Sequence, residues 1–228
     1  MEFIMQFKKM ALTAGVTGSL MAAAFAAQAG TSATLTITGL VTPSACAISL
    51  SDSGTLTFDP VSIEALPESG SYTMEPKTID ALVDCKNTEQ AVAISFVDNR
   101  QDSVAAHSDE PTGSSTAFGL GKTDDNLDIG SYGIKISKVT AEGETGSLLT
   151  SSGNKLTDTW TSLSSDTFVN NGTVAQYITY TDSDGSAPVS KKNYTFTLEV
   201  SPSISSALKA ITSTANLDGN ATINVDYM

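Results

Sequence analysis

The strongest constraint in the sequence is an alternation of apolar and polar side chains. It is clearest between Tyr194 and Val200, which read YTFTLEV. A period of two places every apolar side chain of such a segment on one face of a β-strand. The same period recurs at both ends of the chain and at several places between, whereas helical spacing is almost absent. A chain of short alternating strands buries one face of each by stacking sheets, so the pattern predicts an all-β protein.

The alternating segments are separated by turns rich in Gly, Ser and Asp. We expect strands at 47–50, 55–58, 79–85, 92–96, 117–120, 132–136, 178–180, 194–200 and 221–227. We expect long polar loops at 60–71, at 98–128 around the strand at 117–120, and at 141–171, and the spacing of Ile204, Leu208 and Ile211 predicts a short helix. Together these elements predict one antiparallel β-sandwich domain with enlarged loops.

The first 29 residues have the features of a secretory signal peptide. Lys8 and Lys9 precede an apolar, alanine-rich run, and Ala27-Gln28-Ala29 fits the A-x-A cleavage rule. The run is too short and too rich in alanine for a membrane span, and no other apolar run is long enough for one. We therefore expect an exported mature domain over residues 30–228. Cleavage after Ala26 is an alternative, because Ala24-Phe25-Ala26 also fits the rule.

The composition argues against two classes of partner. The chain has 12 basic and 25 acidic residues and a formal net charge of −13. An acidic surface repels nucleic acid and anionic membranes, so neither is expected as a partner.

Cys46 and Cys85 are the only cysteines, and both remain after signal removal. In an oxidising compartment such a pair predicts one disulfide, which would stabilise the fold by roughly 4 kcal/mol in the chain-entropy model. The alternative, a nucleophilic thiol, needs a histidine partner. The only histidine is His107, within the polar stretch SVAAHSDEPTGSS.

The stretch from Thr31 to Cys46, TSATLTITGLVTPSAC, places a strand almost at the start of the mature chain. Ala33, Leu35 and Ile37 share one face of this strand. A terminal strand can stay in its own sheet or be given to another molecule's sheet, because few covalent neighbours restrain it. The sequence leaves both alternatives open.

Both ends of the chain resemble structural subunits of chaperone–usher fimbriae. Residues 39–46, GLVTPSAC, resemble the family's pattern of a glycine, a hydrophobic pair, small residues and a cysteine, and the second cysteine follows some forty residues later. Residues 220–228, NATINVDYM, resemble the family's final strand with its penultimate aromatic residue. The combination is closest to a poorly characterised branch of fimbrial-like proteins.

The resemblance implies an immunoglobulin-like sandwich that lacks its final strand and so has a hydrophobic groove. A periplasmic chaperone fills this groove transiently, and the N-terminal strand of the next subunit replaces it at an outer-membrane usher. On this basis the donor strand, about residues 30–39, would insert Ala33, Leu35 and Ile37. The groove strand, which the chaperone would also hold, would present Ile223, Val225 and Tyr227.

Catalytic and metal-binding patterns are weak. His107 has no recognisable partner, and no G-x-S-x-G motif occurs. The run from Asp182 to Gly185 departs from the EF-hand spacing, which wants Gly and Glu where Ala187 and Asn193 stand. We expect no catalytic residue, no metal and no cofactor, and we expect Trp160 to be a partly buried anchor rather than a sugar-stacking platform.

The predicted function is therefore a structural subunit of a fimbria, exported through the periplasm to the cell surface. One alternative is a fimbrial tip adhesin that binds a host glycan or protein. Tip adhesins normally carry a receptor-binding domain ahead of the pilin domain, whereas here the pilin-like motif starts near the mature N-terminus. Another alternative is a self-complete soluble periplasmic protein whose N-terminal strand folds into its own sheet.

Overall fold

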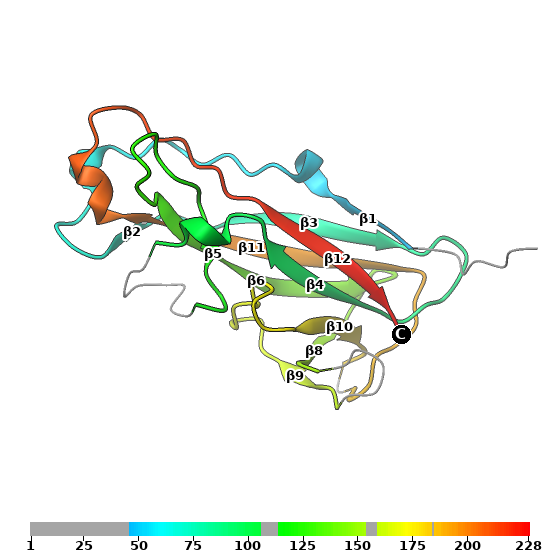
Figure 1. Cartoon of the computed structure of the whole chain (residues 1–228). Coiled ribbons are helices and arrows are strands. Elements are labelled where there is room, and N and C mark those ends of the chain that lie inside the picture. Colours follow the sequence, from blue (N-terminus) through cyan, green and yellow to red (C-terminus); the bar gives the residue numbers. More distant parts are fainter. Residues whose placement is uncertain (1–45, 106–113, 154–158, 184) are drawn as a thin grey trace, which may run out of the picture. The chain divides into compact units, whose positions relative to one another are not determined.

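The structure, a computed structural model, describes residues 46–105, 114–153, 159–183 and 185–228. These residues form twelve β-strands in two sheets, and their only helical elements are four short 3₁₀ segments. Every strand pair is antiparallel. The predicted all-β, two-sheet fold is confirmed (Figure 1).

The first sheet has the strand order β1-β3-β11-β6-β5, with β2 added to β11 and β7 added to β6. Its strands are β1 (Ala47–Leu50), β2 (Ser71–Thr73), β3 (Lys77–Asp84), β5 (Phe118–Gly119), β6 (Gly130–Ala141), β7 (Glu144–Thr145) and β11 (Asn193–Ser205). The two longest strands, β6 and β11, form the centre of this sheet, and a register shift interrupts their pairing between Thr197 and Leu198.

The second sheet has the order β12-β4-β10-β8-β9. Its strands are β4 (Val92–Asp98), β8 (Ser147–Ser151), β9 (Thr161–Leu163), β10 (Tyr177–Thr181) and β12 (Ala221–Tyr227). The final strand of the chain, β12, is an edge strand of this sheet and pairs with β4 along its whole length.

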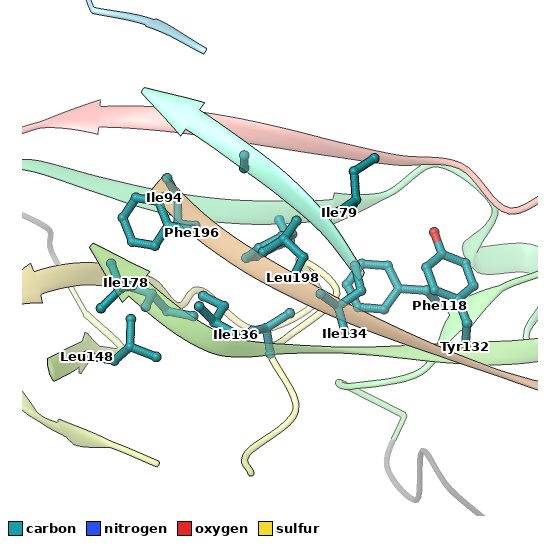
Figure 2. Close-up of a cluster of buried hydrophobic side chains, with 14 of the residues drawn as sticks. Ile79, Ile94, Phe118, Tyr132, Ile134, Ile136, Leu148, Ile178, Phe196 and Leu198 are labelled. Carbon is teal, nitrogen blue, oxygen red and sulfur yellow. The ribbon is translucent and has the colours of Figure 1, made fainter. Parts of the chain in front are cut away.

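The core lies between the inward faces of the two sheets (Figure 2). The alternation that predicted β11 sets which side chains enter it, because Phe196 and Leu198 are buried from the first sheet. Ile94 and Ile178 are buried from the second sheet and stand opposite each other in the β4–β10 register. Burial of each such side chain contributes roughly 1.5–3 kcal/mol to stability.

Three of the sequence predictions are wrong in detail. Residues 55–58 form no strand, although Leu56 and Phe58 share one face as expected. The expected loop at 141–171 contains β7, β8 and β9, and Leu148 of β8 is buried in the core. The expected helix near 204–211 is a 3₁₀ segment over Ser206–Ala210, because Ile204 belongs to β11.

Tyr194 of β11 ties together the loops at one end of the sandwich. Its hydroxyl lies 2.7 Å from the Gln90 carbonyl and 2.8 Å from the Val189 carbonyl, and it accepts a 2.8 Å hydrogen bond from the Lys191 N–H. Burial raises the pKa of Tyr194 to about 12. The hydroxyl therefore stays protonated at physiological pH and can donate to a carbonyl.

We expect Tyr194→Phe to lower the free energy of unfolding by about 1–3 kcal/mol, since buried backbone groups lose their partner. Tyr180→Phe is the matched control. The Tyr180 hydroxyl donates to the exposed carboxylate of Asp182 at 2.9 Å, and water can replace it there. Urea denaturation of both variants measures the difference. Equal losses would contradict the role given to the Tyr194 hydroxyl.

Cys46 and Cys85 form the predicted disulfide, with an S–S distance of 1.97 Å. The bond joins the residue just before β1 to the residue just after β3. It closes a loop of sequence separation 39, and this fastens the short strand β1 to the sheet.

Intact-mass analysis after alkylation without reductant should therefore find neither thiol labelled. The double variant Cys46→Ala/Cys85→Ala should unfold with a free energy lower by roughly 4 kcal/mol, because its unfolded chain is no longer cross-linked. Full labelling of both thiols in periplasmic material would contradict the pairing.

Candidate functional site

The strands β1 and β12 lie along the same border of the sandwich, one in each sheet (Figure 1). Among the described residues β1 pairs only with β3, and β12 pairs only with β4. Each strand therefore has one row of backbone N–H and C=O groups that faces no described strand. Such unpaired edges are sites where a further strand can add.

A pocket of about 370 Å³ lies between these two edges, and we call it the narrow pocket. Ile48 and Leu50 of β1 line one side, and Ala221 and Ile223 of β12 line the other. All four side chains are partly buried and pack against the core. The remaining lining residues are Ser49, Ser53 and Gly54, so no described residue brings a charged side chain to the narrow pocket.

A second pocket of about 830 Å³, the wide pocket, is formed by the segment that follows β1 and the segment that precedes β12. Its walls are residues 56–61 with Ile63, and residues 211–217. The floor is apolar and buried, and consists of Leu66, Met74, Ile129, Ile204 and Leu208. Among the described residues of the lining, Asp59 is the only charged one. The two pockets follow one another along the same pair of segments, and together we call them the groove.

Both ends of β12 are fixed to the rest of the fold. At its C-terminal end, the Tyr227 hydroxyl donates to the Cys46 carbonyl at 3.1 Å and so links the two sheet edges. Gln90 donates from its side-chain amide to the Met228 carbonyl at 2.7 Å. Ahead of β12, Arg100 forms an ion pair with Asp218 at 2.9 Å. The groove wall formed by β12 is therefore held in place at both ends.

The three residues predicted for the groove strand occupy one face of β12. Ile223 lines the narrow pocket, Val225 packs against the core, and Tyr227 links to Cys46. In the register with β4, Ile223 stands opposite Phe96 and Val225 opposite Ile94, both of which point into the core. The predicted donor residues Ala33, Leu35 and Ile37 lie outside the described residues.

Neither wall of the wide pocket was predicted as part of a site. Leu56 and Phe58 were assigned to one strand face, and Ile211 and Leu217 received no role as groove residues. Their meeting across the wide pocket depends on contacts between segments more than 150 positions apart in the sequence. The only local signal was the apolar parity of residues 55–58.

The other candidates yield no site. His107 and Asp184 lie outside the described residues, and Trp160 is partly buried. Asp182 accepts the Tyr180 hydroxyl and lies 3.6 Å from the ammonium group of Lys191. In the part of the chain that the structure describes, no group of three or more His, Cys, Asp or Glu side chains could hold a metal ion.

Comparison with known proteins adds a family match. Residues 35–133 match a family described as "Protein of unknown function (DUF1120)". The match includes both cysteines and extends from Leu35 into β6. No curated protein matches the chain. No described helix is long and apolar enough to cross a membrane.

The groove has the properties of a receptor for one extended strand. Edge backbone groups that pair with no described strand can form main-chain hydrogen bonds, and the apolar side chains of the lining can receive every second side chain of a guest. Water would otherwise cover apolar side chains along this border, so a guest with alternating apolar residues gains hydrophobic burial as well.

Ile223→Asp tests whether the groove is open to apolar molecules. We expect the variant to bind the hydrophobic dye anilinonaphthalene sulfonate several-fold more weakly than the wild type, because a charge in the narrow pocket opposes apolar burial. Asn224→Asp is the matched control, since Asn224 points to the opposite face of β12 and is exposed. Dye fluorescence at equal circular dichroism measures the effect. Equal dye binding by both variants would exclude the narrow pocket as the site.

Proposed function

We propose that this chain is a structural subunit of a surface fimbria, polymerised by donating a β-strand from one subunit to the next. The observation that carries the proposal is the groove: two strand edges without described partners flank the narrow pocket, and the wide pocket beyond it has an apolar, buried floor. A sandwich with this gap is completed by a single strand. The N-terminal segment of a second copy has the alternating apolar pattern that such a strand needs.

The donor segment matches the groove in chemistry. Residues 30–39, GTSATLTITG, contain no charged side chain, and the narrow pocket has none in its lining. Ala33, Leu35 and Ile37 share one parity, so all three would enter the groove while the threonines face outward. Burial of Leu35 and Ile37 would contribute roughly 1.5–3 kcal/mol each.

The same features explain why assembly would require helper proteins. An unpaired strand edge beside exposed apolar side chains promotes aggregation of any subunit that is released alone. Leu217 and Tyr227 are examples, each 39% exposed along this border. We propose that a periplasmic chaperone covers the groove and holds β12 after export, and that an outer-membrane usher exchanges the chaperone for the next subunit's strand at the cell surface. The subunit needs no cofactor and performs no catalysis in this role.

The decisive experiment compares Leu35→Asp with Thr36→Asp. If the strand is donated, Leu35→Asp should nearly abolish polymers, since a carboxylate cannot enter an apolar groove without a large desolvation penalty. Thr36→Asp carries the same charge on the opposite face and should polymerise almost normally. Gel filtration of chaperone-released subunits measures polymers, and thermal melting reports on the fold of each subunit.

Two outcomes would reject the proposal. A wild-type chain that stays a stable monomer at high concentration would indicate a self-complete protein. In that case Leu35→Asp should unfold the monomer itself. Polymers that form equally well from the Leu35→Asp chain would show that assembly uses another surface.

A further inference from the structure

The segment Thr55–Phe58 has the side-chain pattern of a strand but no partner strand among the described residues. Leu56 and Phe58 are partly buried and pack against the core, whereas Thr55 and Thr57 are exposed. The only hydrogen bonds of its backbone within the described chain are a Thr55 N–H bond to the Asp52 carbonyl and a bond to the Thr57 carbonyl. Most backbone groups of this segment therefore have no hydrogen-bond partner within the part of the chain that the structure describes.

A tight turn separates this segment from β1. Asp52, Ser53 and Gly54 have φ values of 48°, 55° and 75°, in the left-handed region. This turn ends the pairing of β1 with β3 at Leu50, so the residues beyond it are not held by the β3 ladder. Another interaction has to position them.

Lys77, the first residue of β3, supplies that interaction. Its ammonium group donates a 2.6 Å hydrogen bond to the Thr57 carbonyl and lies 5.3 Å from the centre of the Phe58 ring. A charge-assisted hydrogen bond and a cation–π contact from one side chain fix both the backbone and a side chain of the segment.

The bond to Thr57 also determines which backbone groups face the groove. In an extended chain the N–H and C=O of one residue point to one side, and those of its neighbours point to the other. Since the Thr57 carbonyl points toward Lys77, the backbone groups of Leu56 and Phe58 point the opposite way. Leu56, Thr57 and Phe58 all line the wide pocket, where a guest strand would lie, and of these the backbone groups of Leu56 and Phe58 point away from Lys77.

We propose that Lys77 is a positioning residue that holds Thr55–Phe58 as a second receiving edge of the groove. This inference rests on the proposed function, because it concerns the strand that the groove receives. The guest pairs with β12 on one side and, in the wide pocket, with the backbone of Leu56 and Phe58 on the other. Because Lys77 already orders this edge, the guest does not bear the full entropic cost of ordering it.

The test uses the full mature chain carrying Leu35→Asp and Ile37→Asp, so that it receives a strand but cannot donate one. The probe is a synthetic peptide of residues 30–39. Lys77→Met keeps the aliphatic stem and removes the charge and the donor, and Lys77→Arg keeps both. Lys138→Met, an exposed lysine on β6 in the same sheet, is the matched control. Peptide affinity is measured by fluorescence anisotropy, and amide exchange is followed by nuclear magnetic resonance.

We expect Lys77→Met to weaken peptide binding by about tenfold, the combined effect of one hydrogen bond and one cation–π contact. Lys77→Arg should recover most of the affinity, and Lys138→Met should not change it. In the acceptor that keeps Lys77, the peptide should slow amide exchange at Leu56 and Phe58, but not at Thr57. In Lys77→Met that protection should be lost, while protection of β12 remains.

Three results would overturn the inference. If Lys77→Met binds the peptide like the control and protects Leu56 and Phe58 equally, Lys77 has no positioning role. If Lys77→Met loses β12 protection to the same extent, the residue acts through the fold as a whole. If the peptide protects neither β12 nor Thr55–Phe58 in the acceptor that keeps Lys77, the proposed function fails and the inference fails with it.

Discussion

The edge strands of the two sheets differ in length, and the organisation of this protein depends on that difference. The edge strands at the other ends of the two sheet orders, β5 and β9, have only two and three residues and offer little backbone to a partner. By contrast, the edge strand β12 is seven residues long, and no described strand pairs with its outer side. Long unpaired edges are avoided in soluble sandwiches because they invite strand addition. Here the long edge also stands beside the groove, and the proposal of strand addition rests on this juxtaposition.

The groove is built into the fold rather than formed by loose chain ends. The disulfide holds the start of β1, and the Tyr227 hydroxyl joins that point to the end of β12. The ion pair between Arg100 and Asp218 fixes the approach to β12. Contacts to the core and to each other therefore hold both strand edges without any contribution from a guest. A preformed gap lowers the entropic cost of binding, so most of the free energy of side-chain burial is available for affinity.

The sequence predicted those parts of the fold in which local pattern and tertiary environment agree. β11, β3, β4 and β12 alternate because each has one face on the core. The disulfide followed from the predicted signal peptide and the cysteine count. By contrast, β8 reads SLLTS, in which two adjacent leucines hide the alternation, and β2 and β9 have only three residues each. Such segments become strands through their neighbours and carry no periodic signal of their own.

One wall of the candidate site could likewise be predicted from its local pattern, and the other could not. The wall formed by β12 was predictable, because Ile223 and Val225 alternate with polar residues in a strand that pairs along its full length. The wall formed by residues 55–61 was not, since its position depends on a left-handed turn and on a lysine about 20 residues away in the chain. The topology of the fold decides which segments face each other across a groove. The local sequence of either segment carries no signal of that pairing.

The wrong prediction at residues 55–58 bears directly on function. A segment without a ladder partner can bury two side chains in many backbone conformations, and nothing in the isolated chain requires a period of two there. That period is required once the segment pairs with a neighbouring strand and presents one face to the core. Residues 33–37 carry the same period, and the only vacant position that the described sheets offer beside an apolar lining is the groove. The alternation at 55–58 is thus explained if the sequence is adapted to the completed sandwich, in which one guest strand in the groove pairs with β12 beside the narrow pocket and with this segment beside the wide pocket.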